Sequence, residues 1–529
     1  MGLRALTVYH LLQHNARTVG TAPVAIDAGP RLPPSGAGRT LTHQQFLDRV
    51  DRLAAGITAC GIIKGDRVCV LAPNSIEYLE LYGACAKTGA IAYPISWRLS
   101  ASEVQGVVAL ADPKMLVVDA AHLPQLAGLD LSRLRVRATL GGSAAGFIPL
   151  PDLYEASTPS AGSGRGLSGV KRSRRATPPH AGVSDDDPFV IISTAAVAGV
   201  PRGAILTHRN LIMANLQVIA SLGLTARDRH LAALPLFHIA GLGLSLAVLQ
   251  AGGANVVLQA FDPARAAQLI DEHQVTVMAD FPPMLSMLLE ARATLRDGAP
   301  WSSLAHVIGL DAPDTIQRLH AETGAKFWTG FGQSETTGLV TLVRADEKPG
   351  SAGKPAPLAR VRCVNEAGED VPVGEPGEIA VQGPLVFAGY WRDPDATDYV
   401  FRNGWHHTGD IGKFDAEGYL TYVGRKPEKD LIKSGGENVY PAEVERVVRE
   451  LPEVAAVCVI GVPDPKWGES VKAVVELKPG HTLTAGQVGE AVARRIAAYK
   501  KPRYVVFVQR LPRKNDGDID RHAVKAAHG

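Results

Sequence analysis

The sequence predicts an α/β fold in which a large N-terminal domain is followed by a small α+β C-terminal domain, and three observations lead to this prediction. At 529 residues, the chain is too long to fold around one hydrophobic core. Between residues 41 and 120, segments of helical periodicity alternate with short apolar runs, as is typical of α/β proteins. After residue 425 the pattern becomes more compact and indicates a separate unit of about a hundred residues.

The N-terminal region shows the clearest alternation. Residues 41–57 repeat apolar side chains at helical spacing, and residues 67–72 form an apolar run that predicts a buried strand. A second helix is expected over 76–86 and a second strand over 90–94. Residues 239–258 are strongly apolar but contain Gln250, Gly252, Gly253 and Asn255. They therefore predict a buried helix followed by a buried strand rather than a membrane span.

The remaining segments complete the predicted layout. Residues 156–187 are rich in Ser, Gly, Pro and Arg, and we interpret them as a solvated loop rather than a nucleic-acid contact. Pro441 suits the first turn of a helix. Strands are expected over 454–462 and 471–477, and Thr484 is expected to cap a helix that ends near Ala498.

Composition excludes several classes of protein. The 55 basic and 53 acidic side chains leave a net charge of +2, so no global field attracts nucleic acid or an anionic membrane. The five cysteines show no zinc-ligand spacing and are expected to be buried thiols of a reducing compartment. With neither a signal-peptide pattern nor a membrane span, the sequence predicts a cytoplasmic protein. Its oligomeric state is left open, with a homodimer as one option.

Two glycine-containing motifs and one acidic residue suggest nucleotide chemistry. Gly199 and Gly203 follow the apolar run 189–193, and glycines after a strand let backbone N–H groups approach phosphate oxygens, although such a segment can also be a simple turn. No Walker A pattern occurs. The motif G-F-G-Q-S-E at 330–335 ends in Glu335, and one carboxylate can hold Mg²⁺ together with phosphate oxygens. Asp410 could accept both hydrogens of a ribose diol.

Together with T-G-D-I-G at 408–412 and S-G-G-E at 434–437, these motifs resemble those of the adenylate-forming (AMP-binding) superfamily, in particular the acyl-CoA synthetases. The resemblance covers nearly the whole chain. It implies an N-terminal domain over residues 1–425, with stacked β-sheets flanked by helices and a small β-barrel-like part. It also implies a mobile α+β lid domain over 426–529 that turns about a hinge near 425–429, at Lys429.

The resemblance also implies the substrates and the residues that contact them. ATP would bind as a magnesium complex, with Glu335 holding the metal, and coenzyme A would pass the glycine turn at Gly435 and Gly436. His238 would line the carboxylate pocket. No aspartate stands where amino-acid-activating relatives bind an α-ammonium group, so a fatty or aromatic carboxylate is expected. The positions implied for ATP or AMP are Thr194, Gly199, Arg202, Gly203, Ala312, Pro313, Phe331, Gly332, Ser334, Asp410 and Arg425.

The chain departs from the family pattern at two places that serve ATP. Asp518 stands where the family has the lysine of adenylation, and the loop at 194–203 has lost most of its hydroxyls. Lys514 or Arg521 could substitute for that lysine. Three hypotheses follow: a complete ligase that compensates for the loss, a thioester-forming enzyme that uses preformed acyl-AMP, or a non-catalytic nucleotide or acyl binder. The sequence is compatible with either a natural or an engineered Asp518.

Overall fold

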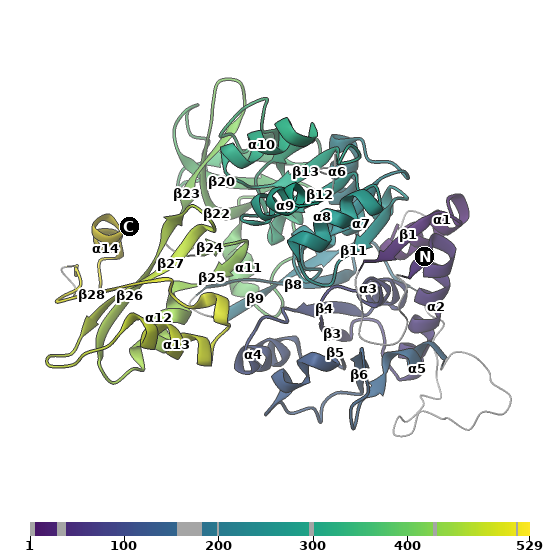
Figure 1. Cartoon of the computed structure of the whole chain (residues 1–529), viewed down its shortest axis with the longest axis horizontal. Helices are drawn as coiled ribbons and strands as arrows, with labels where there is room; N and C mark the ends of the chain where they lie inside the picture. Colours follow the sequence, from purple (N-terminus) through teal and green to yellow (C-terminus); the bar gives the residue numbers. More distant parts are fainter. Residues whose placement is uncertain are drawn as a thin grey trace.

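The computed structural model describes residues 6–28, 39–155, 182–197, 200–295, 301–426, 431–514 and 517–529, with the backbone alone for 195–197 and 200–201. Helix-covered sheets form the main body of the molecule, and the C-terminal sheet with its helices lies at one side of it (Figure 1). The N-terminal helices lie at the opposite side.

Two large sheets form the main body. The first contains nine strands in the order β18 (Lys354–Pro355), β17 (Thr341–Arg344), β14 (Lys326–Thr329), β13 (His306–Gly309), β12 (Val277–Asp280), β10 (Arg229–Ala232), β11 (Ala254–Val257), β1 (Pro23–Asp27) and β2 (Thr40–Thr42). The second contains seven in the order β7 (Ile148–Pro149), β6 (Val136–Leu140), β5 (Met115–Asp119), β3 (Arg67–Leu71), β4 (Ile91–Ile95), β8 (Pro188–Val197) and β9 (Val200–Thr207). Most neighbouring strands are parallel, as expected when helices connect them.

The other described strands form two smaller sheets and a two-stranded ribbon. An antiparallel sheet contains β19 (Arg360–Val364), β20 (Gly377–Gln382), β22 (Trp405–Phe414), β21 (Phe401–Arg402) and β23 (Leu420–Arg425). The C-terminal sheet contains β25 (Glu437–Val439), β24 (Ile432–Ser434), β27 (Gly468–Leu477), β26 (Val454–Asp464) and β28 (Tyr504–Val508). A two-stranded ribbon joins β15 (Gly332–Gln333) to β16 (Gly338–Leu339).

Helices cover the sheets of both regions. In the main body they are α1 (Val8–Thr18), α2 (His43–Ala59), α3 (Ile76–Thr88), α4 (Ala101–Ala111), α5 (Leu150–Glu155), α6 (His208–Leu222), α7 (Ile239–Gln250), α8 (Pro263–Glu272), α9 (Met284–Ala293), α10 (Pro313–Thr323) and α11 (Pro394–Val400). The C-terminal part, which we define as residues 431–529, contains α12 (Pro441–Arg449), α13 (Ala485–Arg495) and α14 (Arg521–His528). The described residues also form the short 3₁₀ helices η1 (Ala120–Leu126), η3 (Ser334–Thr336) and η4 (Ala498–Lys500).

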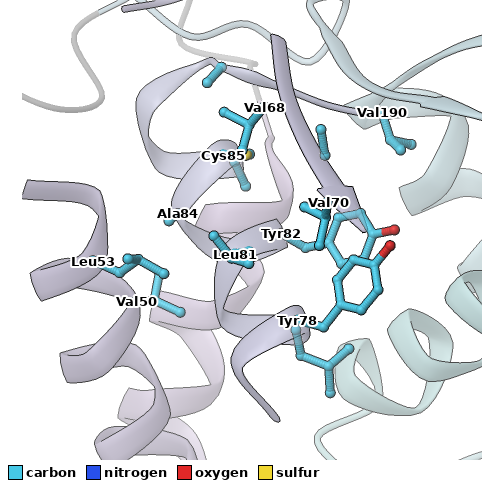
Figure 2. Packing of buried hydrophobic residues seen from close by; sticks show 14 of the residues in the cluster. Val50, Leu53, Val68, Val70, Tyr78, Leu81, Tyr82, Ala84, Cys85 and Val190 are labelled. Atoms are coloured by element: carbon cyan, nitrogen blue, oxygen red, sulfur yellow. The ribbon is translucent and has the colours of Figure 1, made fainter. Parts of the chain in front are cut away.

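The core between helices α2 and α3 and the seven-stranded sheet fixes the frame of the main body. The rings of Tyr78 and Tyr82 stack at 5.4 Å and lie against Val70 (Figure 2). The Tyr82 hydroxyl donates to the carbonyl of Leu236 at 2.8 Å. Asn74 is buried, donates to the Leu234 carbonyl at 2.9 Å and accepts from the Leu236 amide at 2.8 Å. These side-chain hydrogen bonds link the turn after β3 to the segment after β10, so the two large sheets are held together.

The fold predictions are confirmed, with one small correction. The helices and strands expected over 41–94 and over 239–258 are present, as is the C-terminal α+β sheet. The helix that begins after Thr484 ends at Arg495 rather than near Ala498, because Ile496 has extended backbone, and a 3₁₀ turn follows. Most of the predicted loop, residues 156–181, lies outside the described residues.

Further expectations concern cysteines, membranes and metals. All five cysteines are buried thiols, as expected. Among the described residues, none of the helices combines the length and apolar character needed to cross a bilayer. The same residues contain no group of three or more His, Cys, Asp or Glu side chains suited to a metal. The homodimer, the compartment and the domain boundary near 425 stay predictions, as does the mobility of the C-terminal part.

Candidate active site

A cavity of about 1310 Å³ lies where the nine-stranded sheet, the antiparallel sheet and the C-terminal part meet. Its wall includes the residues that directly follow the parallel strands β10, β12 and β13, such as Ala233, Phe281 and Leu310. In open α/β sheets, ligands bind at the carboxyl ends of the strands. The C-terminal part contributes the glycine turn at 434–437 to the same wall. One cavity therefore collects most of the residues that the sequence motifs singled out.

Glu335 lies in the 3₁₀ helix η3 at the edge of this cavity. Its carboxylate is buried and accepts a 3.0 Å hydrogen bond from the Tyr390 hydroxyl. Burial and the neighbouring Glu335 raise the pKa of Tyr390 well above its usual range, so the phenol stays a donor. Arg202 lies over the Tyr390 ring at 5.3 Å and donates to Asp393 at 2.9 Å. Arg202 and Glu335 thus both contact Tyr390, and Arg202 already has a carboxylate partner in Asp393.

The other predicted parts of the phosphate segment are partly described. Thr194 lines the cavity, and its hydroxyl donates to the carbonyl of Arg202 at 3.4 Å. A Cβ at Gly203 would lie 2.5 Å from the Ile191 side chain, so this position requires glycine for close packing of β9 on β8. Gly199 lies outside the described residues.

Asp410 lies in β22, buried at the cavity wall. Its carboxylate accepts a 2.9 Å hydrogen bond from the Gln333 side-chain amide. Arg425 is the cross-strand partner of Asp410 in β23. The Arg425 guanidinium donates to the carbonyl of Leu431 at 2.7 Å and lies 3.8 Å from Glu469. Strand pairing therefore brings the acid and the arginine together, while Arg425 also contacts the C-terminal part.

An aromatic slot lies next to Asp410. The ring of Phe331, at the ribbon that carries Gly332, stacks with Tyr422 at 6.4 Å and an interplanar angle of 22°. Such flat faces are suited to an adenine ring. Pro313 also lines the cavity, at the first turn of α10. Ala312 is the N-cap residue of that helix.

The remaining predicted nucleotide residue, Ser334, also lines the cavity. It follows Gly332, where a Cβ would lie 2.1 Å from the carbonyl of Gly338. A side chain at this position would therefore push β15 and β16 apart and displace Ser334 and Glu335.

His238, the N-cap residue of α7, contacts the C-terminal part. Its Nε2 atom lies 3.3 Å from the Glu437 carboxylate, and Arg98 forms an ion pair with the same carboxylate. Burial alone would raise the pKa of Glu437, but His238 and Arg98 lower it to about 2. The ionised Glu437 thus contacts two side chains of the main body, Arg98 in an ion pair and His238 in a hydrogen bond.

The glycine turn at 434–437 packs closely against aromatic side chains. A Cβ at Gly435 would lie 2.6 Å from the Trp467 ring, and one at Gly436 would lie 3.3 Å from Phe281. Gly435 also has φ +58, in the left-handed region. The guanidinium of Arg503 lies over Trp467 at 4.3 Å. Both Trp467 and Arg503 line the cavity, so this end combines the closely packed glycine turn with a positive charge.

The residues around Asp518, the position where the family has a lysine, do not line this cavity as far as they are described. Lys514 and Asp518 are exposed, and neither belongs to the cavity wall as the described residues define it. Arg521 donates to Glu445 at 2.7 Å within the C-terminal part. Helix α14, which directly follows this segment, lies at the outer end of the molecule (Figure 1). The predicted hinge residue Lys429 lies outside the described residues.

Several residues of the site were not identified as site residues by sequence reasoning. Gln333, Tyr390 and Arg98 carry no local signal that links them to Asp410, Glu335 and Glu437, because each pair is far apart in the chain. Glu437 stood within the recognised motif at 434–437 and could have been singled out there.

Comparisons with known proteins show the family of this chain. The chain matches the AMP-binding enzyme family over residues 12–391 and the C-terminal domain of AMP-binding enzymes over 443–517. It is 36% identical to a feruloyl-CoA synthase of Amycolatopsis over 93% of this chain and 95% of the relative. It is 32% identical to the long-chain-fatty-acid–CoA ligase FadD13 of Mycobacterium tuberculosis over 90% of this chain and 91% of the relative.

A solved structure of o-succinylbenzoate CoA synthetase from Bacillus subtilis, a double mutant bound to a product analogue, superimposes with a TM-score of 0.81. The two chains are 26% identical, and the match covers 98% of each. The family match spans more than half of the chain, and the relatives are matched over nearly their full length. This chain therefore belongs to the AMP-binding, adenylate-forming enzyme family, among its acyl-CoA-ligase-like members.

Proposed function

We propose that this protein is a complete AMP-forming acyl-CoA ligase that activates a hydrophobic carboxylate with ATP and transfers it to coenzyme A. The observation that carries the proposal is the shared cavity, where Asp410 and Glu335 face the same space as His238 and the glycine turn. A nucleotide site and a thiol passage on one cavity support two consecutive half-reactions. An adenylate could then react without leaving the protein.

In the first half-reaction, an oxygen of the substrate carboxylate attacks the α-phosphorus of ATP, and pyrophosphate leaves. Asp410 would accept the ribose hydroxyls, and the Phe331 ring would pack on adenine. Glu335 is a buried carboxylate at the cavity edge with one oxygen bonded to Tyr390, which fits a single protein ligand for Mg²⁺. When bound, the metal would offset charge on the phosphates. The protein groups would mainly position the reactants and stabilise charge.

In the second half-reaction, the sulfur of coenzyme A attacks the acyl carbonyl carbon, and AMP leaves with the former carboxylate oxygen. Gly435 and Gly436 carry no side chain, so Trp467 and Phe281 pack directly on the turn, and a narrow thiol arm could pass close to its backbone. Arg503 lies at the cavity wall, where its charge suits a phosphate of coenzyme A. The arrangement of the C-terminal part supports this second step.

The cavity wall beside His238 favours an apolar acyl group. Helices α6 and α7 contribute Val218, Leu222, Ala240 and Leu244 to it. Such a surface suits alkyl or aryl carbon. The relatives named above act on ferulate and on long-chain fatty acids, which agrees with a fatty or aromatic carboxylate.

Asp518 supports a second candidate, a thioester-forming enzyme that takes a preformed acyl-AMP. An aspartate would bring negative charge toward ATP phosphates instead of offsetting theirs. A non-catalytic binder is the third candidate, but it gives no reason to keep Glu335, Asp410 and the glycine turn on one cavity.

The three candidates differ in which mixtures yield thioester. Mass spectrometry would compare acid, Mg-ATP and coenzyme A with preformed acyl-AMP and coenzyme A, over aromatic acids and fatty acids of several lengths. Product from both mixtures supports the complete ligase. Product from acyl-AMP alone supports the second candidate, and product from neither supports the third. The Asp410→Ala variant is the matched control, since it should lose the signal from ATP.

A further inference from the structure

The start of helix α4 in the main body contacts the segment between α13 and β28 in the C-terminal part. The Glu103 carboxylate accepts a 2.7 Å hydrogen bond from the Lys500 ammonium and a 2.9 Å bond from the Ala497 amide. The Ser102 hydroxyl donates to the carbonyl of Arg495 at 3.2 Å. Three direct hydrogen bonds therefore join the two parts at this one place.

The charges at this contact are largely removed from water. The side chain of Lys500 is 5% exposed, and those of Glu103 and Glu443 are 15% and 10% exposed. Glu443, on α12, accepts a second hydrogen bond from the Lys500 ammonium at 2.5 Å. Burial would lower the pKa of Lys500, but the two carboxylates raise it, so the ammonium stays charged. A buried charge with fixed partners specifies one geometry far more strictly than an exposed pair.

The same short segment of the main body makes a second contact with the C-terminal part. Arg98 pairs with Glu437 at the glycine turn, and Glu103 pairs with Lys500. Helix α12, which carries Glu443, begins at Pro441, just after the turn. Residues 98–103 thus hold both the turn itself and the helix that follows it. The contact at Glu103 reaches helix α12 through Lys500 and Glu443.

We propose that Glu103 and Lys500 are positioning residues that lock the C-terminal part in the orientation for thioester formation, and this proposal rests on the proposed function. Lys500 and Glu443 lie in one part, so a rotation of that part keeps their ion pair. Of the two hydrogen bonds from the Lys500 ammonium, such a rotation breaks only the one to Glu103. Loss of the Glu103 charge therefore weakens the thioester-forming orientation and leaves the adenylation orientation unaffected.

The test uses the full-length Glu103→Gln variant. Glu103 also caps α4 by accepting from the Ser100 amide at 2.8 Å, and glutamine can make the same cap. The change thus removes the charge opposite Lys500 with little effect on the helix. Glu490→Gln is the matched control, because Glu490 forms an exposed ion pair with Arg494 inside α13. Thermal unfolding of each variant checks that the fold is retained.

Two half-reactions are then measured separately. We expect Glu103→Gln to slow thioester formation from preformed acyl-AMP and coenzyme A by about 10- to 100-fold, as for the loss of a hydrogen bond to a charged group. Pyrophosphate release from acid and Mg-ATP should change less than about twofold. A purely structural defect would slow both steps alike, and that result would overturn the proposal. The Ser102→Ala variant should show the same pattern with a smaller effect.

A readout that needs no activity separates this proposal from the proposed function. Dyes are attached to cysteines placed at the exposed positions Ser132 and Lys478, one in each part, because the five natural cysteines are buried. Glu103→Gln should shift the energy-transfer efficiency between them, whereas Glu490→Gln should not. An unchanged efficiency would overturn the proposal even if wild type is active. If the efficiency shifts but the wild-type protein forms no thioester, the positioning role of Glu103 and Lys500 is supported and the proposed ligase activity is rejected.

Discussion

The ion pair of Glu437 with Arg98 and its hydrogen bond with His238 allow a quantitative prediction for the Glu437→Gln variant. Glutamine resembles the protonated carboxyl in shape but has no charge. The ordinary pKa of 4.5 and the value of about 2 in the protein differ by about 2.5, which corresponds to about 3 kcal/mol in favour of the ionised form. Since the Glu437 side chain is only 11% exposed, little of this energy is lost to solvent screening.

This energy acts between the two parts of the protein, because both partners of Glu437 lie in the main body. The variant should therefore favour separation of the C-terminal part by up to about 3 kcal/mol. The sign with pH follows from the lowered pKa. The contribution is fully present above about pH 4.5 and is lost as the pH falls toward about 2.

Hydrogen exchange at the Ala497 amide measures this separation. That amide donates to Glu103 across the boundary, so it is freed when the two parts move apart. We expect exchange in Glu437→Gln to be up to about 300-fold faster than in wild type at neutral pH. Glu490→Gln, which removes an exposed pair within α13, should not change it. An increase below about threefold would refute the reasoning, because the charges would then contribute nothing to the contact.

Three further predictions address other parts of the molecule. Asp518→Lys should raise the rate of pyrophosphate release from acid and Mg-ATP by about 10²- to 10³-fold, because a lysine would offset charge on the phosphates. It should leave thioester formation from acyl-AMP unchanged, since Asp518 does not line the cavity as described. An equal change of both rates relative to wild type would contradict this prediction. Glu335→Gln should raise the Mg²⁺ concentration needed for half-maximal adenylation at least about tenfold, and an unchanged magnesium titration would exclude Glu335 as a ligand. Asn74→Ala should lower the free energy of unfolding by about 2–4 kcal/mol in denaturant titrations, because four backbone hydrogen bonds to this side chain are lost. Gln44→Ala, which removes an exposed hydrogen bond to Asp48, is its control and should change stability little.

Local patterns in the sequence determined the fold class and most of the elements. Apolar periodicity predicted a helix over 41–57 and a strand over 67–72, close to the observed 43–59 and 67–71, since a side chain's burial repeats with the geometry of its own element. Short motifs identified Glu335, Asp410 and the glycine turn as candidates for the site. Each motif is contiguous in the sequence because it lies on a single turn or strand end. The end of α13 was predicted three residues too late, because nothing in the residue type of Ile496 indicates its extended backbone.

Only the tertiary structure decided which of these residues meet. Gln333 and Asp410, Tyr390 and Glu335, and Lys500 and Glu103 are separated by 77, 55 and 397 positions, and each pair depends on how sheets and parts pack. The structure also decided that the glycine turn, and not the segment around Asp518, faces the cavity. Such contacts arise from the summed burial of many side chains, so no single stretch of sequence encodes them.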